Sequence, residues 1–143
     1  EKVLNYIINS DALIFASEFE TWGLPLSEAK FYSKDIFVLE EQDQPGAITC
    51  VSYQLSVPED EHNLFEICDD PNTAVFYTIW SYKSGKGRQL ILDSVNYIQE
   101  HRSSVRNFVT LSPKTEMARR FHLNNGARVL RENANTINYV YER

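Results

Sequence analysis

A glycine-rich loop and two polar side chains in the second half of the chain are of residue types that can carry chemistry. The loop at 84–88 contains Gly85 and Gly87 and precedes a helical stretch. Such a loop can bind a phosphate, because its backbone N–H groups converge on an anion and the helix dipole adds partial positive charge. Further along, Ser112 ends an expected strand and His122 lies on the next expected helix. A hydroxyl can orient a substrate and an imidazole can transfer a proton near neutral pH, so the pattern predicts a proton-transfer site near a phosphate-binding loop.

Hydrophobic periodicity predicts the elements that position these residues. The segment 74–80 is rich in β-branched and aromatic residues, which favours a strand, and Leu90, Ile91, Val95 and Ile98 recur at helical spacing. In chain order we expect a helix at 1–9, a strand or helix at 12–16, a short helix at 26–32, strands at 35–41 and 46–54 joined by a turn at 43–46, a polar loop at 55–73 with room for one short strand at 64–68, a strand at 74–80, a helix at 88–101, a strand at 107–111, a helix at 115–123 capped by Thr115, and strands at 127–131 and 137–141.

This order of elements predicts the fold class. The strand, helix and strand between residues 74 and 111 need a crossover connection, which places the two strands parallel. The other strands pair as antiparallel neighbours. The sequence therefore predicts one α/β domain over residues 1–143, with a mixed, mostly antiparallel sheet and helices on both faces.

Composition narrows the class of protein. The 143 residues fit one domain of ordinary size, and 43% hydrophobic residues can form a packed core. The net charge of −6, from 20 acidic and 14 basic residues, disfavours nonspecific nucleic-acid binding, which needs Lys and Arg. No apolar run approaches the roughly 18 residues of a membrane helix. We therefore expect neither nucleic acid nor a membrane as a partner.

Cysteine usage and local charge add three expectations. Cys50 and Cys68 are too few for a disulfide framework, so we expect two buried free thiols in a reducing compartment and a cytoplasmic location. No spacing of His, Cys and Asp resembles a metal site, so no metal is expected. Lys83, Lys86 and Arg88 gather basic charge at the glycine loop of an otherwise acidic chain, which suits a phosphorylated cofactor.

The succession of strong strand, glycine loop, helix, strand and helix resembles the second half of the GNAT fold of acyl-CoA-dependent N-acyltransferases. The resemblance implies that the strands at 74–81 and 107–112 splay apart and that the pantetheine arm of acetyl-CoA or coenzyme A enters the gap. The GNAT pattern Gln/Arg-x-x-Gly-x-Gly/Ala, placed on Gly85 and Gly87, has Tyr82 at its Gln/Arg position. The residues that the resemblance implies for cofactor binding are Tyr77, Ile79, Lys83, Gly85, Lys86, Gly87 and Arg88.

The segment 118–127 resembles the next GNAT motif, Ala-x-x-Leu-Tyr-x-x-x-Gly-Phe, with His122 in place of its Tyr. That Tyr often protonates the departing thiolate of coenzyme A. The resemblance therefore implies that His122 is the general acid of an acyl transfer.

The local sequence is even more similar to that of the GNAT-fold catalytic domain of malonyl-CoA decarboxylases. The shared features are a Leu-Ser-Pro strand end at 111–113, a Phe-His-Leu-x-Asn-Gly-Ala segment at 121–127 and Asn-Tyr-x-Tyr at 138–141. The family has a long insertion between the first two features, which this sequence lacks. The resemblance implies that Ser112 hydrogen-bonds a malonyl carboxylate and that His122 protonates the acetyl-CoA enolate.

Three functions follow as expectations. The first is transfer of an acyl group, expected to be acetyl, to a small-molecule or peptide amine, with His122 as acid and Ser112 positioning the acyl group or acceptor. Glu20, Glu28 or a water chain would then have to act as base. The second is a malonyl-CoA decarboxylase-like reaction on the same two residues. The third is a noncatalytic module that binds coenzyme A or another protein. The sequence also leaves open whether the protein forms a homodimer.

A competing resemblance lies at the N-terminus. The segment 16–29 is similar to the sugar-nucleotide segment of retaining GT-B glycosyltransferases, with Glu20 and Glu28 as its Glu pair. An enzyme of that class has two Rossmann domains, which need far more than one domain's length. We interpret this match as chance.

Overall fold

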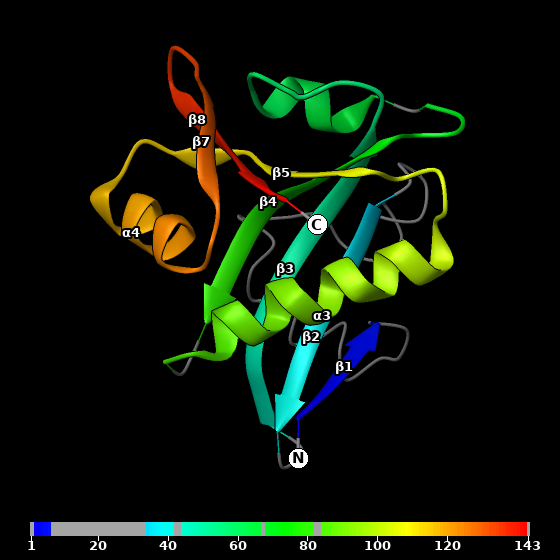
Figure 1. Ribbon diagram of the computed structural model, residues 1–143, viewed down its shortest axis with the longest axis vertical. Coiled ribbons are helices and arrows are strands. Elements are labelled where there is room, and N and C mark those ends of the chain that lie inside the picture. The colour runs from blue at the N-terminus through cyan, green and yellow to red at the C-terminus, as the bar shows by residue number, and fades with distance from the viewer. Residues whose placement is uncertain (1, 7–33, 42–43, 67, 82–83, 143) are drawn as a thin grey trace.

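The computed structural model describes residues 2–6, 34–41, 44–66, 68–81 and 84–142. Its elements form one sheet with helices packed on it (Figure 1). In chain order they are β1 (Lys2–Tyr6), β2 (Lys34–Glu41), β3 (Gln44–Gln54), the 3-10 helix η1 (Glu61–Phe65), β4 (Thr73–Ser81), α3 (Lys86–His101), β5 (Asn107–Thr110), β6 (Ser112–Pro113), α4 (Glu116–Asn124), β7 (Arg128–Glu132) and β8 (Thr136–Tyr141). No helix among these residues is long and apolar enough to cross a membrane.

The sheet is mixed, as the sequence predicts. In the described part of the chain it has eight strands in the order β1-β2-β3-β4-β5-β8-β6, with β7 paired to β8. The β4–β5 pair is parallel, and the other pairs are antiparallel. Helix α3 makes the crossover between β4 and β5, as a parallel pair requires.

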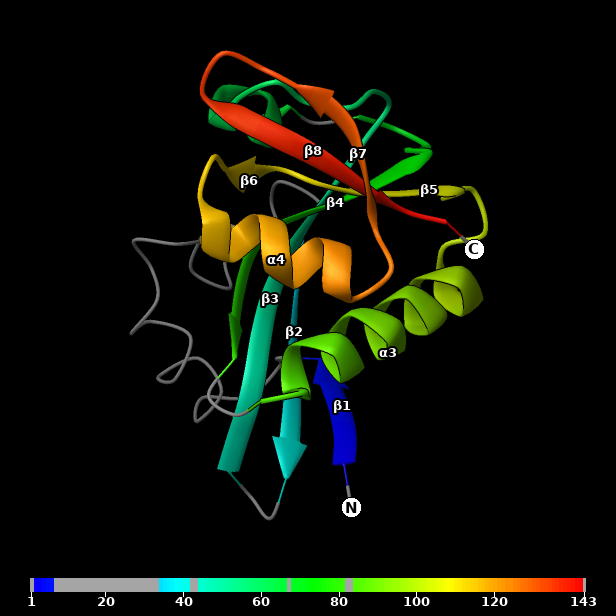
Figure 2. The ribbon, with the colours of Figure 1, turned by 60° about the vertical axis from the view of Figure 1, so that its left-hand side comes forward.

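Two apolar clusters cover the two faces of the sheet. Along β4, Ala74 and Phe76 belong to the larger cluster, which includes the buried side of α3, whereas Val75 belongs to a smaller cluster with Leu64 of η1. Alternation along a strand places these two sets on opposite faces. Figure 2 shows α3 and α4 together on one side of the sheet, so the ligand-binding and catalytic candidates of both helices lie on the same face.

The two helices begin in different ways. Thr115 caps α4 through its Oγ1, which accepts from the Ala118 N–H at 3.2 Å, as predicted. At α3 the N-cap is Gly85, with φ of 82°, and no side chain caps the helix. The four buried residues predicted at helical spacing, from Leu90 to Ile98, face the core.

Two local predictions are wrong. Residues 2–6 form β1 rather than a helix, because the segment pairs antiparallel with the edge of β2, from Lys2 opposite Glu41 to Tyr6 opposite Phe37. A five-residue helix would have few backbone hydrogen bonds, whereas the ladder supplies partners along the segment. Residues 61–65 form η1 where a strand near 64–68 was expected, because Asp60 accepts from the His62 N–H and starts a helical turn. The elements expected at 12–16 and 26–32 lie outside the described residues.

An ion pair between half-buried Arg102 and buried Asp35 fixes the C-terminal end of α3. Arg102 Nε lies 3.4 Å from Asp35 Oδ2, and Tyr53 Oη donates to the same oxygen at 2.5 Å. The guanidinium also lies over the Tyr53 ring, 4.0 Å from its centroid. These contacts tie the end of α3 to β2 and β3 and leave the opposite end of the helix to face the ligand candidates. Both cysteines are free thiols, as expected, and Cys50 is buried. Cys68 was also expected to be buried but is half-buried.

Candidate active site

The parallel strands β4 and β5 separate partway along β4. Their pairing joins Thr73–Phe76 to Asn107–Thr110 and then ends, while β4 stays paired with β3 as far as Ser81. At the same point β4 has a bulge, because Tyr77 is the extra residue between two consecutive pairs with β3. The predicted splay between the two strands is therefore present, and the bulge lies where the pairing with β5 ends.

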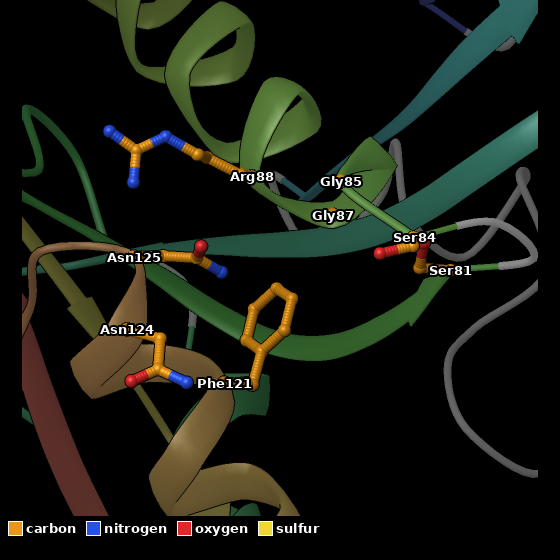
Figure 3. Close-up of a pocket in the computed structure, with 8 residues that line it drawn as sticks. All are labelled: Ser81, Ser84, Gly85, Gly87, Arg88, Phe121, Asn124 and Asn125. Carbon is orange, nitrogen blue, oxygen red and sulfur yellow. The ribbon is translucent and has the colours of Figure 1, made fainter.

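A cavity of about 400 Å³ opens beside the separated end of β4 (Figure 3). It lies between the first turn of α3, the end of β4 and the C-terminal half of α4. Its lining residues are Ser81, Ser84, Gly85, Gly87, Arg88, Phe121, Asn124 and Asn125.

The cavity has the electrostatics of an anion site. The first turn of α3 contains no acidic residue, and its N-cap Gly85 has no side chain to cap the N-terminus, so the helix dipole presents partial positive charge there. Among the described residues that line the cavity, Arg88 is the one that carries a charge, and it is exposed. Asn124 and Asn125 add amide donors from the opposite wall (Figure 3). A phosphate group is the kind of ligand that such a lining favours.

The structure places the predicted cofactor residues in three groups. Gly85, Gly87 and Arg88 line the cavity. Lys86 does not line it: its side chain is buried, and its Cγ would lie 3.5 Å from a Cβ added to Gly46 of β3. Tyr77 and Ile79 lie half-buried on β4, against the smaller and the larger apolar cluster.

One predicted cofactor residue, Lys83, lies outside the described residues, as do both candidate bases, Glu20 and Glu28. Sequence reasoning did not assign Asn124 and Asn125 to the ligand site. In the sequence they indicate only the end of a helix, since Asn and Gly commonly follow the last turn.

Ser112 and His122 are brought together, as expected. Ser112 Oγ lies 3.2 Å from His122 Nε2. Ser112 is on β6, directly after the separated end of β5, and His122 is the buried residue of α4. Their exposed fractions are 5% and 4%, so the pair is shielded from bulk water.

Two further side chains complete a hydrogen-bonded chain through His122. Ser112 Oγ donates to Thr110 Oγ1 at 2.8 Å, and His122 Nδ1 lies 2.7 Å from Tyr141 Oη. A serine hydroxyl has one proton, so a Ser112 that donates to Thr110 can only accept from His122 Nε2–H. His122 Nδ1 then accepts from the Tyr141 hydroxyl. Sequence reasoning used Tyr141 as part of a motif and gave it no role.

Burial sets the protonation states of this chain. It lowers the pKa of His122 from 6.5 to about 4, because the charged imidazolium is poorly solvated there. Burial raises the pKa of Tyr141, against a smaller opposite effect of the Arg88 charge. At neutral pH both groups are therefore uncharged. His122 can donate a proton from Nε2 only as a neutral imidazole, with the Tyr141 hydroxyl placed to replace that proton at Nδ1.

Aromatic rings enclose the imidazole. The Tyr139 ring stacks on it with centroids 4.8 Å apart, and the rings of Phe121 and Tyr141 meet it edge-on at 5.1 and 5.8 Å. Phe121 also lines the cavity, so the cavity and the buried pair are adjacent through consecutive residues of α4.

The chain has the GNAT fold, and solved structures of two kinds share it. Malonyl-CoA decarboxylase from Rhodopseudomonas palustris matches with a TM-score of 0.78 at 18% identity, over 99% of this chain and 56% of that one. The enzyme of the same name from Agrobacterium vitis matches with a TM-score of 0.76 at 17% identity, over 99% and 60%. Campylobacter jejuni N-acetyltransferase PseH, in complex with acetyl coenzyme A, matches with a TM-score of 0.65 at 12% identity, over 100% and 99%.

The chain thus spans between half and two thirds of the length of these decarboxylase chains and nearly all of the acetyltransferase. No protein-family profile matches the sequence. No curated protein is similar to it by sequence.

Proposed function

We propose that this protein binds an acyl-coenzyme A and acts on its acyl group. The pyrophosphate would lie at the uncapped N-terminus of α3, with Arg88 and the amides of Asn124 and Asn125 beside it. The pantetheine arm would run along β4 where β5 departs, past Tyr77 and Ile79. Three solved structures of similar fold hold coenzyme A or acetyl-coenzyme A, which supports the same ligand class here.

The reaction we propose is decarboxylation of a malonyl-type thioester. The observation that carries it is the Ser112 to His122 contact of 3.2 Å inside a buried, uncharged site. Among the described residues the one buried carboxylate is Asp35, near the far end of α3, and the groups hydrogen-bonded to the imidazole are the neutral hydroxyls of Ser112 and Tyr141. Neutral donors with no carboxylate bonded to the imidazole suit an anionic carboxylate better than an ammonium group.

The residues have distinct parts in this reaction. When substrate binds, the Ser112 hydroxyl turns from Thr110 and donates its proton to the carboxylate, which orients it. The apolar surroundings favour uncharged CO₂ over the desolvated carboxylate. When the carbon–carbon bond breaks, its electron pair stays on the thioester carbon, which must take up a proton. His122 Nε2 supplies that proton while Tyr141 donates to Nδ1. The Nδ1 proton then returns to Tyr141, and a proton from solvent restores Nε2–H. One proton is consumed and CO₂ leaves.

A second candidate is N-acyl transfer to a small-molecule or peptide amine. It is favoured by the match to the PseH acetyltransferase over nearly the full length of both chains. The same Tyr141 to His122 chain would protonate the departing thiolate. The amine would need a base, for which Glu20 and Glu28 are the candidates. If neither reaction occurs, a noncatalytic module that binds coenzyme A is the third candidate.

The test combines one binding and two activity measurements. Thermal unfolding with coenzyme A, acetyl-CoA and malonyl-CoA at 100 times Kd should raise stability by about 2.7 kcal/mol, or several degrees. Malonyl-CoA without an acceptor should then release CO₂, and His122→Gln should lose that release while keeping the ligand shift. His62→Gln, at an exposed histidine, is the matched control.

The possible outcomes separate the candidates. Free thiol from acetyl-CoA only in the presence of amines would select acyl transfer. Ligand binding without turnover in either assay would select the noncatalytic module. No ligand shift with any of the three compounds would overturn the proposal as a whole.

A further inference from the structure

Thr110 is the last residue of the parallel ladder and is held by hydrogen bonds on two sides. Its Oγ1 accepts from the Tyr139 N–H at 3.1 Å and from Ser112 Oγ at 2.8 Å. Its backbone carbonyl accepts from Asn138 Nδ2 at 2.8 Å. The residue is fully buried, so water does not compete for these bonds. Thr110 is therefore fixed against β8 at the point where β5 gives way to β6.

Asn138 helps to hold Thr110, and its side-chain amide has a single possible orientation. Its amide nitrogen donates to two carbonyls, that of Thr110 and that of Pro58 at 2.9 Å, and its Oδ1 accepts from Asn133 Nδ2 at 2.9 Å. Carbonyl oxygens can only accept, so the orientation of the Asn138 amide is determined by its partners. A fully buried, fully bonded amide of this kind holds its neighbours rigidly.

The position of Thr110 controls the direction of the Ser112 hydroxyl. Because that hydroxyl has a single proton and gives it to Thr110, its oxygen accepts from His122 Nε2–H. We propose that Thr110, held by Asn138, is a positioning residue that keeps the resting proton of His122 on Nε2 rather than Nδ1. Thr110 acts through Ser112 and makes no contact with the imidazole in this arrangement. The catalytic use of the tautomer rests on the proposed function, whereas the tautomer itself does not.

Nitrogen-15 NMR of the histidine side chains tests the inference directly. His122→Gln identifies the His122 signals, and exposed His62 and His101 serve as internal references. At pH 7 the wild-type protein should show neutral His122 with its proton on Nε2. In Thr110→Val the Ser112 hydroxyl loses its acceptor and turns to His122, so the proton should move to Nδ1. Thr110→Ser keeps an acceptor and should retain the wild-type tautomer.

Each result either supports or overturns the inference. A wild-type proton on Nδ1 overturns it without any variant. An unchanged tautomer in a folded Thr110→Val protein overturns it as well, and so does a switch in Thr110→Ser. Thr110→Ala is the second variant if Thr110→Val does not fold, and it should give the same switch. Because the readout is a tautomer and not turnover, a failure here is distinguishable from a failure to bind or convert acyl-CoA.

Discussion

The ring of Phe121 on α4 lies directly against Gly87 in the first turn of α3. A Cβ placed on Gly87 would be 2.5 Å from Cε1 of that ring and 2.7 Å from Cζ, closer than real Cβ atoms come. Glycine at this position therefore lets the two helices approach and close the cavity between them (Figure 3). Packing against Phe121 is therefore one reason for a glycine at position 87, and the approach of a ligand to its backbone would be a second.

Gly87→Ala should show this packing constraint. In an unconstrained helix the change would stabilise the protein by about 1 kcal/mol. Here the Phe121 ring must move, so we expect no gain in the melting temperature and a smaller ligand-induced shift with coenzyme A. The double variant Gly87→Ala with Phe121→Ala should recover the helix gain relative to Phe121→Ala alone. A Gly87→Ala protein that melts higher and binds as wild type would contradict the contact.

Gly85 is needed for its backbone conformation rather than for space. Its φ of 82° is in the left-handed region, and a Cβ there would meet nothing within 4 Å. Gly85→Ala should therefore cost about 1 kcal/mol of backbone strain, which lowers the melting temperature by about 3 to 5 °C. Gly85→Asn should cost less, because Asn tolerates this conformation. Equal melting temperatures for the Ala variant and the wild type would argue against the strained turn.

Arg88 should supply the side-chain charge for the ligand phosphate. Its loss in Arg88→Ala removes a charge-assisted hydrogen bond, for which we expect roughly tenfold weaker binding of coenzyme A by calorimetry. Arg120→Ala is the matched control, since Arg120 is exposed on α4 and lies 3.9 Å from Glu116 rather than in the cavity. Equal losses in the two variants would mean that general charge, and not the cavity, attracts the ligand.

The order of strands and helices could be predicted because the periodicity of the second half is strong and its turns are distinct. The cap at Thr115, the helical spacing from Leu90 to Ile98 and the strand expected at 74–80 agree with α4, α3 and β4 to within a few residues. The first segment failed because the few apolar residues of Lys2–Tyr6 fit a helix or a strand equally well by spacing. The segment forms a strand because it pairs with the edge of β2, which is a tertiary contact and not a local property of the sequence.

The site could be predicted only where residue type and motif coincide. Ser112 and His122 carry recognisable chemistry and prove to be in contact. Thr110 and Tyr141 join the same chain through β5 and β8, and nothing in their local sequence indicates which atoms they meet. The Lys86 side chain was expected at the ligand from its charge and its place in the glycine loop, but it lies buried beside Gly46.

His122 should make the stability of the protein depend on pH. Its pKa is about 4 in the folded state and near 6.5 when unfolded, so between these values the unfolded chain binds more protons. The contribution is fully present above pH 6.5 and is lost as pH falls toward 4, by about 3 kcal/mol in all. Urea unfolding at pH 7, 6 and 5 covers the upper part of this window, in which about 2 kcal/mol should be lost. In His122→Gln this loss should be absent, whereas His62→Gln should keep the wild-type pH dependence.

Tyr141→Phe separates proton supply from ligand binding. The Tyr141 hydroxyl is 2.7 Å from His122 Nδ1 and does not line the cavity, so its removal should leave the affinity for coenzyme A unchanged. Turnover should fall about 100-fold, because the imidazole that gives up its Nε2 proton no longer receives one at Nδ1. The pKa of His122 should not rise in this variant, since the site stays buried and apolar. A Tyr141→Phe enzyme with wild-type turnover would show that the imidazole acts without this hydroxyl, and single-turnover kinetics with malonyl-CoA would detect even a tenfold change.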